Sequence, residues 1–345
     1  MNIRYATEDE VASWNDIVDQ NPSGGNILQG KEFIDQKIKA GWTPRYIVSD
    51  QCALAVIEKH FPLFGKVWYS PKGPGVDTVE QLSELLDELP SFAKQHGVTT
   101  IKIEPELPHD TDMSPIVTKF AAHKTTPVQY NYATVLVDLA PSEDEIMMAL
   151  NQKGRHAIRR AERDGVTVKQ VEPTDENCAV MYDLFVQTAS GAGFVIRPAS
   201  YYREFYKAYG DNGGLFFAYH EGQVVAGAFA MVQGSKSMYK DGASVRERSV
   251  YGASHLLQWE VIKWAKSRGS KQHDLAGTPP IDQIKNSEHP FYGLGRFKTS
   301  FNKTVTQYVG AYDIPVRPLR AKLWYVILEK LVRKLYFMRR GESWY

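Results

Sequence analysis

The sequence predicts a protein of the α/β (α+β) class that is built from two copies of one unit. Helical patterns alternate with short strand-like runs along the 345 residues. Residues 92–97 (FAKQHG) match residues 264–269 (WAKSRG), and residues 65–69 match residues 234–239 with one gap, at offsets of 172 and 170. Helices that end in this way also recur by chance, but two matches in the same order at nearly one offset indicate a duplication.

Length and composition limit the possible classes of protein. The chain is long enough for two domains with a core each, and 43% hydrophobic with 23% charged residues is typical of a folded globular protein. The net charge of +1 implies no general attraction to nucleic acid or membrane, so such a partner would have to meet a local patch.

Cysteine and histidine usage predicts no special chemistry. Cys52 and Cys178 lie in unlike contexts, and the nine histidines are scattered without metal-ligand spacing. We therefore expect no disulfide, no metal and no cofactor. The N-terminal residues lack the apolar core of a signal peptide, and no apolar run approaches the roughly 18 residues of a membrane-spanning helix. A soluble, cytoplasmic protein is expected.

The first half begins with a helix for which Thr7 and Glu10 provide a capping box. A loop at residues 21–25 ends it, and a short helical stretch surrounds Phe33. Strands are expected at 45–48, 53–59 and 67–70. A helix over 79–96, ended by Gly97, and a strand at 100–104 follow.

The second half repeats this order. A helix over 175–188 leads into a loop at 190–193, and Pro198 begins a short helix that extends to Tyr209. Strands at 215–219, 223–232 and 237–240, separated by tight turns, predict a β-meander. A helix over 251–268, ended by Gly269, leads to a strand at 271–275.

The boundary between the two copies is expected near residues 129–132. We predict domain 1 at 1–131, completed by a C-terminal segment at 309–345, and domain 2 at 132–308. A strand at 134–139 opens domain 2. Ser142 and Glu145 form a second capping box, which begins a helix expected to run to Arg163. A last strand is expected at 306–309.

This order of elements is that of the GNAT acyltransferase fold, so we predict two tandem GNAT-like domains with a cleft between them. Enzymes of this fold hold the pyrophosphate of acyl-CoA on a (Gln/Arg)-x-x-Gly-x-(Gly/Ala) turn at a helix N-terminus. Residues 248–254 (RSVYGAS) do not have that spacing. The sequence therefore predicts acyl transfer from a carrier other than CoA.

Six segments carry a more specific signal through their order and spacing. They are Leu28-Gln29 with Phe33 and Lys37, residues 153–166, Arg197-Pro198 with Tyr201, residues 241–244, residues 256–265, and residues 293–298 (GLGRFK). With them the chain resembles the Fem family of peptidoglycan aminoacyltransferases over roughly residues 10–312. The resemblance is to the short, FemX-like type without a coiled-coil insertion.

The resemblance implies transfer of an amino acid from aminoacyl-tRNA to the stem-peptide amine of a peptidoglycan precursor. The acceptor would be UDP-MurNAc-pentapeptide or its lipid-linked form. An aminoacyl ester is already activated, so the enzyme needs mainly positioning and charge stabilisation. The resemblance places Lys298 at the reacting ester, where its ammonium could stabilise the developing oxyanion. Phe297 beside it would either contact the substrate or pack in the core.

The acceptor's diphosphate is assigned to two cations, Lys37 and Arg197, each near the second helix of its unit. A solvated helix face is the alternative for Lys37. Tyr201 shares a helical face with Arg197 and would contact the acceptor or pack in the core. Asp241 stands near a position where the FemX-like pattern has a tyrosine. It could orient the acceptor amine or accept its proton, or it could be a turn residue before Gly242.

Two basic segments remain. Arg155, Arg159 and Arg163 recur every four residues of one helix, and either bind tRNA phosphate or form a solvated face. Residues 317–345 hold eight Lys or Arg and two Glu with an apolar stripe. This segment either docks on domain 1 or contacts an anionic membrane at its inner face. A monomer is expected.

Two other functions are compatible with the sequence. One is an N-acyltransferase with a different acyl donor, and the other is a non-catalytic protein that binds tRNA or a lipid-linked precursor. The altered pyrophosphate turn argues against CoA as the donor, and the presence of both Lys298 and Arg197 argues against a protein without activity.

Overall fold

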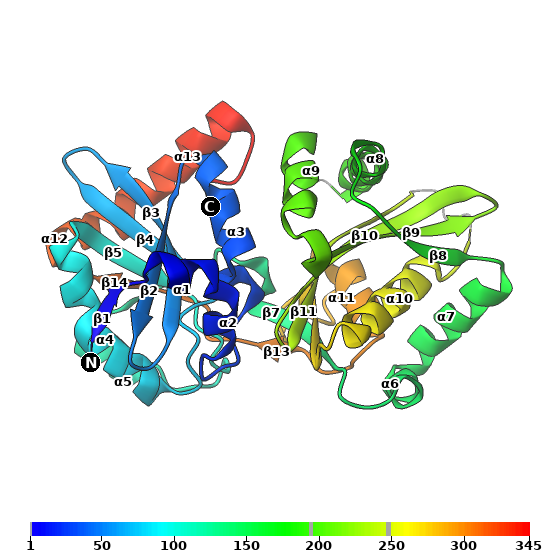
Figure 1. Ribbon diagram of the computed structural model, residues 1–345, viewed down its shortest axis with the longest axis horizontal. Coiled ribbons are helices and arrows are strands. Elements are labelled where there is room, and N and C mark those ends of the chain that lie inside the picture. The colour runs from blue at the N-terminus through cyan, green and yellow to red at the C-terminus, as the bar shows by residue number, and fades with distance from the viewer. Residues whose placement is uncertain (1, 193–195, 246–249) are drawn as a thin grey trace. The chain divides into compact units, whose positions relative to one another are not determined.

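The computed structural model describes residues 2–192, 196–245 and 250–345, which form two compact units. Unit 1 comprises Met1–Tyr132 and Gln307–Tyr345, and unit 2 comprises Ala133–Thr306. Each unit is organised around one seven-stranded sheet with its own helices (Figure 1). This confirms the predicted α/β class.

The sheet of unit 1 has the strand order β1-β2-β3-β4-β5-β14-β6. Its strands are β1 (Ile3–Tyr5), β2 (Thr43–Ser49), β3 (Ala53–Phe61), β4 (Gly65–Ser70), β5 (Val98–Ile103), β6 (His123–Thr125) and β14 (Ala311–Pro315). Its helices are α1 (Glu8–Ala12), α2 (Trp14–Asp19), α3 (Lys31–Gln36), α4 (Val79–Gln95), α5 (Ser114–Phe120), α12 (Pro318–Leu323) and α13 (Glu329–Arg340). Short helical turns lie at η1 (Ile27–Gln29), η2 (Lys37–Ala40), η3 (Tyr130–Tyr132) and η5 (Trp324–Leu328), of which η5 is π-helical.

The core of unit 1 forms where the apolar stripe of α4 meets the sheet. Leu82, Leu86 and Leu89 of this helix pack with Val56 and Ile101 of the strands. Residues 53–57 of β3 are all buried, so both faces of this strand are covered. The predicted Thr7–Glu10 capping box is present at the start of α1.

The sheet of unit 2 has the strand order β13-β7-β12-β11-β10-β9-β8. Its strands are β7 (Ala133–Asp138), β8 (Thr167–Val171), β9 (Gly213–His220), β10 (Gln223–Gln233), β11 (Lys236–Ser244), β12 (Gln272–Gly277) and β13 (Thr306–Gln307). Its helices are α6 (Glu143–Ala149), α7 (Gln152–Arg163), α8 (Asp175–Ala192), α9 (Ala199–Ala208), α10 (Ala253–Ser267) and α11 (Tyr292–Lys298), with a short turn η4 (Gly210–Asn212).

The two sheets share one topology. Read from β1 and from β8, the strands follow in the same order, and the parallel pair is β4 with β5 in one unit and β11 with β12 in the other. A long helix, α4 or α10, joins the two strands of each parallel pair, because parallel strands require a crossover connection. The sixth strand differs in origin: β7 is the first strand of unit 2 in sequence, whereas β14 is added to unit 1 after unit 2 is complete.

Two sequence predictions about helices are wrong. The helix that begins at Ser142 does not continue to Arg163, because Leu150 and Asn151 are extended and divide it into α6 and α7. Asn151 accepts a hydrogen bond from Lys153 N and caps α7, and asparagine is a favoured N-cap residue. The predicted loop at 190–193 is helical as far as Ala192, because one glycine costs a helix only about 1 kcal/mol. Gly193 lies outside the described residues.

The C-terminal segment packs against the N-terminal part of unit 1. Strand β14, which the sequence patterns did not predict, is paired with β5 on one side and with β6 on the other. Trp344 and Tyr345 are buried, and their rings contact Trp42, with Trp344 also close to Trp324. The strand expected at 306–309 is limited to β13, at Thr306–Gln307.

Candidate active site

The parallel strands of unit 2 separate part-way along their length. Strands β11 and β12 are paired only from Lys236↔Gln272 to Met238↔Asp274, although β11 continues to Ser244 and β12 to Gly277. In unit 1 the equivalent pairing of β4 with β5 continues to Ser70↔Ile103, the last residue of each strand. In unit 2 the ends of the two central strands are therefore unpaired with each other, and this unpaired stretch is here called the opening; in unit 1 the corresponding strands are paired to their ends.

A bulge shapes the β12 side of this opening. The register between β12 and β7 shifts between Asp274 and Gly277, and Ala276 has a φ of +60°, which a residue with a side chain rarely adopts. Asp274 Oδ1 accepts a hydrogen bond from Ala276 N at 2.7 Å, and the hydroxyl of Thr134 contacts both the Asp274 carboxylate and Ala276 O. These contacts hold the strained bulge in place.

The bulge presents a backbone carbonyl to Lys298. Lys298 is the last residue of α11 and is 3% exposed, and its Nζ donates to Gly277 O at 2.6 Å. Burial lowers the pKa of Lys298 to about 7, and the negative charge of Asp274 partly opposes this shift. At neutral pH this amine is populated in both protonation states, so it can donate or accept a proton.

Asp241 lies on the β11 side of the opening. It is paired with Phe229 of β10 inside the strand, so the alternative of a turn residue is wrong. Its carboxylate accepts hydrogen bonds from Tyr206 Oη at 3.3 Å and Lys240 Nζ at 3.2 Å. Burial, together with the charge of Asp241, raises the pKa of Tyr206 well above its usual value, so Tyr206 stays protonated and its hydroxyl donates a hydrogen bond to Asp241.

Helix α9 carries Tyr201 and Tyr206, whereas Arg197 lies two residues before its first residue, so the expectation that Arg197 shares a helical face with Tyr201 is wrong. The Arg197 guanidinium lies 4.8 Å from the centre of the Tyr201 ring, and Arg197 N donates to Tyr202 Oη at 3.3 Å. Tyr206 of the same helix stacks on Phe229 with ring centres 4.1 Å apart. The structure thus brings Arg197, Tyr201 and Asp241 to one aromatic cluster. Both proposed roles of Tyr201, packing and substrate contact, stay open, because its ring is half-buried beside Phe205.

Phe297 packs in the core of unit 2. Its ring meets His255 edge-on at 5.0 Å and Phe301 at 5.4 Å. This packing fixes the end of α11, of which Lys298 is the last residue.

Lys37 belongs to unit 1. It is 8% exposed and its Nζ lies 4.7 Å from the centre of the Phe33 ring. The alternative of a solvated helix face is therefore wrong for this residue. Its proposed contact with an acceptor diphosphate is a prediction that involves both units.

The three arginines of α7 do not have equal surroundings. Arg155 Nη1 donates to Met148 O at 2.9 Å and also to Leu150 O, so it caps the end of α6. Arg159 and Arg163 are exposed on the helix. Ala157, Ile158 and Ala161 are buried on the opposite side, as the sequence pattern predicted.

Helix α7 packs against the start of α10, where acyl-CoA enzymes of this fold hold pyrophosphate. Gly252, with a φ of +88°, precedes α10, and a Cβ at this position would lie 2.1 Å from Ala157 O. Arg160 lies 5.6 Å from the centre of the Tyr251 ring at the same place. The segment predicted to depart from the pyrophosphate turn is residues 248–254, of which residues 248 and 249 lie outside the described residues.

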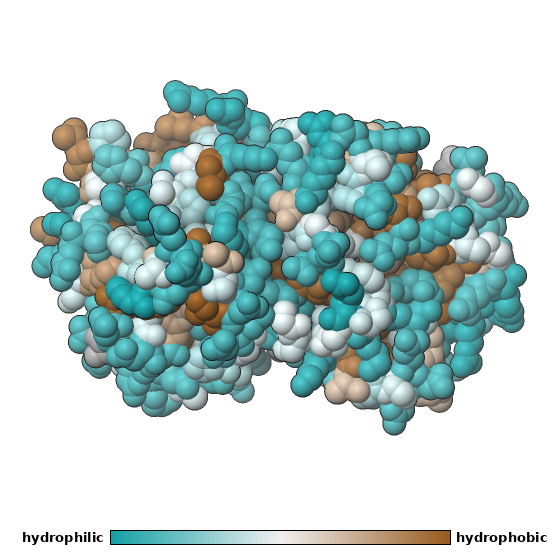
Figure 2. All heavy atoms as spheres, in the orientation of Figure 1, coloured by the Kyte–Doolittle hydropathy of each residue, from teal (hydrophilic) through white to brown (hydrophobic). Residues whose placement is uncertain are grey.

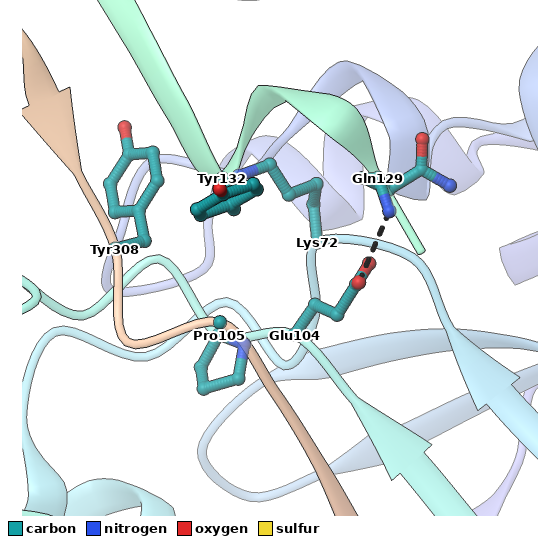
Figure 3. A pocket seen from close by; sticks show the side chains of 7 residues that line it. Lys72, Glu104, Pro105, Gln129, Tyr132 and Tyr308 are labelled. Atoms are coloured by element: carbon teal, nitrogen blue, oxygen red, sulfur yellow. Dashed lines mark hydrogen bonds between the residues drawn. The ribbon is translucent and has the colours of Figure 1, made fainter. Parts of the chain in front are cut away.

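Unit 1 contains a small pocket at the corresponding strand ends (Figure 3). It is lined by Lys72, Glu104, Pro105, Gln129, Tyr132, Tyr308 and Gly310. Glu104 accepts a hydrogen bond from Gln129 N at 3.2 Å, and Lys72 Nζ donates to Asn131 O at 3.0 Å. The cavity is about 10 Å³, enough for about one water molecule, so it does not admit a substrate.

Comparison with known proteins shows the family of this chain. The model of the FemAB family matches residues 118–221 and 216–330. The chain belongs to the FemAB family. This confirms the resemblance inferred from the six sequence segments.

Individual relatives extend the match over nearly the whole chain. A lipid II:glycine glycyltransferase of Staphylococcus aureus (strain MRSA252) is 24% identical over 414 aligned residues, covering 92% of this chain and 97% of the relative. A crystal structure of FemX has a TM-score of 0.79 at 21% identity and covers 95% of this chain and 100% of that one. A tandem GNAT protein from the clavulanic acid pathway has a TM-score of 0.50 at 13% identity and covers 92% and 99%.

Family and fold together identify this FemAB protein as an aminoacyltransferase with two GNAT-like domains. The sequence analysis selected Lys298 and Asp241 as catalytic candidates. It did not select Asp274 and Thr134, which hold the bulge of β12, or Tyr206, which donates a hydrogen bond to the Asp241 carboxylate. Asp274 lies in the strand segment HDLAG, where an acidic residue inside an apolar strand was the available signal. In the described part of the chain, none of the helices combines the length and the apolar composition that a membrane span requires.

Proposed function

We propose that this protein transfers an amino acid from aminoacyl-tRNA to the stem-peptide amine of a peptidoglycan precursor. The acceptor is UDP-MurNAc-pentapeptide or its lipid-linked form, and the product builds the bridge between stem peptides. Membership of the FemAB family supports this function, as does the glycyltransferase activity on lipid II for which the staphylococcal relatives are named.

The reaction forms one amide bond and breaks one ester bond. The neutral acceptor amine attacks the ester carbonyl, and negative charge develops on the carbonyl oxygen. As the ester C–O bond breaks, the ribose oxygen leaves and takes up a proton, while the new amide nitrogen loses one. The balance requires one group that gives a proton and one that accepts it.

Lys298 is the main support for the proposal, because its surroundings suit the group that gives a proton. It is buried, hydrogen-bonded to Gly277 O at 2.6 Å, and its pKa is lowered to about 7. An ammonium in such a site can stabilise the oxyanion and protonate the leaving ribose oxygen. Asp241, whose carboxylate is already oriented by Tyr206, is the proposed acceptor of the amine's proton.

The remaining predicted residues bind the two substrates in this proposal. Lys37 and Arg197 bind the acceptor's diphosphate, with Tyr201 beside Arg197 at 4.8 Å. Arg159 and Arg163 bind tRNA phosphates, because both are exposed on α7. Arg155 contributes less to tRNA binding, because it caps α6. The enzyme acts as a monomer.

A mass-spectrometric assay tests the function directly. Purified protein is incubated with a complete pool of charged tRNA and either UDP-MurNAc-pentapeptide or the lipid-linked precursor. The expected result is a mass gain on one acceptor that RNase treatment abolishes, and the gain identifies the amino acid. No gain with folded protein in either reaction would contradict the proposal.

A CoA-dependent N-acyltransferase is the second candidate, and the packing at Gly252 disfavours it. The carbonyl oxygen of Ala157 lies only 2.1 Å from the position that a Cβ at Gly252 would take. Helix α7 therefore leaves little space for a pyrophosphate at the first turn of α10. A mass gain that depends on acyl-CoA and survives RNase would favour this candidate.

A further inference from the structure

We propose that the outer face of the C-terminal helical segment, α12 through α13, binds the surface of an anionic lipid bilayer. The face carries an apolar stripe, here called the outer stripe, made of Leu319, Leu323, Val326, Ile327, Leu331, Leu335 and Met338. These side chains are between 44% and 88% exposed. Figure 2 shows hydrophobic atoms among hydrophilic ones in the region where Figure 1 places α13.

The outer stripe is not the face that packs on unit 1. Ala321, Trp324 and Glu329 are buried on the other side of the same helices. Trp324 contacts Phe61 and Phe64 of the β3–β4 hairpin with ring centres 5.1 and 5.5 Å apart. The segment therefore has two apolar faces, and a helix that only docks on its domain needs one.

The π-helical turn keeps the outer stripe on one side. Leu319, Leu323, Ile327, Leu331 and Leu335 recur every four residues. In a regular α-helix each such step rotates the side chain by about 40°, so four steps would rotate it by about 160°. The turn Trp324–Leu328 accommodates one extra residue, which removes about 100° of this rotation.

The charge of this face fits an anionic surface. Six exposed cations flank the stripe: Arg320, Lys322, Lys330, Lys334, Arg339 and Arg340. The one acidic residue in residues 317–340, Glu329, is buried and accepts a hydrogen bond from Tyr345 Oη at 2.7 Å. Basic residues beside an apolar helical face are the composition of helices that lie in the membrane interface.

A second element adds an apolar contact beside the helix. Leu63 at the tip of the β3–β4 hairpin is 99% exposed, and Arg320 Nη1 donates to the carbonyl of its neighbour Phe64 at 3.2 Å. The hairpin tip therefore lies next to α12. An exposed leucine there has no role in packing, but it could enter a bilayer together with Leu319.

Other occupants fit less well. Two copies of this chain would place their cations against each other, which is unfavourable. Nucleic acid would satisfy the cations, but it offers no partner for seven exposed apolar side chains. A bilayer with anionic lipids satisfies both features.

Vesicle co-sedimentation of the full chain tests the proposal without any substrate, so its outcome is separate from that of the transfer assay. Vesicles of phosphatidylcholine alone are compared with vesicles of phosphatidylcholine and phosphatidylglycerol in equal amounts. We expect at least about tenfold tighter binding to the anionic vesicles, weakened by salt.

Two variants separate the apolar and ionic contributions. Leu323→Ser/Ile327→Ser/Leu331→Ser and Lys330→Glu/Lys334→Glu should each weaken binding at least about tenfold. Met148→Ser/Lys303→Glu, two exposed positions of unit 2, is the matched control and should bind as the wild type does. All substituted residues are exposed, so the melting temperature should not change.

Three results would overturn the proposal. The first is absent or equal binding to both kinds of vesicle. The second is a change of oligomeric state in the apolar variant, measured by light scattering, which would make the stripe an interface between copies. The third is loss of tRNA binding in the charge variant without any effect on vesicles, which would make the face a nucleic-acid surface.

Discussion

Lys298 shows how one residue can be costly to the fold and useful to the reaction. An unfolded chain would keep this amine protonated up to a pKa of 10.5, whereas in the folded protein the pKa is about 7. Between pH 7 and 10.5 the unfolded chain therefore binds more protons, and the stability of the fold rises with pH across this window. Below pH 7 the folded protein carries the full cost of a buried ammonium.

Lys298→Met should separate activity from stability. Without the ammonium we expect transfer to fall by at least about 100-fold. The melting temperature at pH 7 should stay within a few degrees of the wild type, because removal of the buried charge offsets the hydrogen bond lost at Gly277 O. The transfer assay and a thermal melt check this, and a strong fall in melting temperature would make Lys298 a structural residue.

The pH profile distinguishes the protonated amine from a positioning role. If the ammonium is the active form, the wild-type rate should fall above pH 7, since the pKa of Lys298 is about 7. Lys298→Arg keeps its charge at all these pH values, so any residual activity should not decline there. An alkaline decline common to both proteins would assign it to another group.

His273 should contribute to acid sensitivity. Burial lowers its pKa to about 3, and its ring lies between Ser237 Oγ at 2.8 Å and Gln258 Nε2 at 2.9 Å. The unfolded chain takes up a proton near pH 6.5, so stability is lost as the pH falls from 6.5 towards 3. Urea unfolding at pH 7 and pH 4.5 should show a smaller loss for His273→Gln than for the wild type.

His156→Gln, an exposed histidine of α7, is the matched control and should leave this pH dependence unchanged. An equal loss in the wild type and His273→Gln would mean that acid destabilisation arises elsewhere.

At the scale of elements, the packing of α7 on α10 depends on one glycine. Gly252 and Gly269 flank α10, and their φ angles are +88° and +90°. A Cβ at Gly252 would lie 2.1 Å from Ala157 O, whereas a Cβ at Gly269 would have no atom within 4 Å. Gly269→Ala should cost about 1 kcal/mol of backbone strain, and Gly252→Ala more than about 2 kcal/mol. Urea midpoints measure both, and equal costs would show that the close approach is unimportant.

The exposed side of α7 predicts a salt-dependent interaction. Arg159→Gln/Arg163→Gln should weaken tRNA binding and reduce the slope of log affinity against log salt by about two. Arg155→Gln should instead lower the melting temperature, because Arg155 bonds to Met148 O at 2.9 Å. Unchanged tRNA binding in the double variant would leave α7 as a solvated face.

At the scale of the whole molecule, buried charges fasten the C-terminal segment to unit 1. Lys102 of β5 lies 2.9 Å from Asp313 of β14 and 3.4 Å from Glu329 of α13, with all three side chains buried. Lys102→Met would leave the buried Asp313 carboxylate without its cation and would leave Glu329 with only Arg333 at 4.0 Å, which should cost about 3–5 kcal/mol and make residues 311–345 sensitive to protease.

Lys119→Met is the control for this change. Lys119 pairs with Asp87 at 2.6 Å, but both side chains are about half exposed, so its loss should cost at most about 1 kcal/mol. Equal stability of the two variants, or cleavage elsewhere, would contradict the role of the buried pair.

Much of the fold could be predicted because it depends on neighbouring residues. The capping boxes at Thr7 and Ser142 and the buried face of α7 follow from contacts between residues one to four positions apart. The break at Leu150 was missed because its apolar side chain continues the helical pattern while it packs in the core. Strand β14 was missed because it is short and lies in a segment expected to be a tail.

The sequence by itself predicted the helices and the β-meander of each unit, the duplication of the unit, and the family motif that ends in Lys298. The three-dimensional arrangement alone decided what these residues experience. The separation of β11 from β12, the bulge held by Asp274 and the burial that lowers the pKa of Lys298 each depend on segments more than 20 residues apart. Local periodicity encodes which residues are apolar, but burial and electrostatics depend on every chain segment that excludes water from a site.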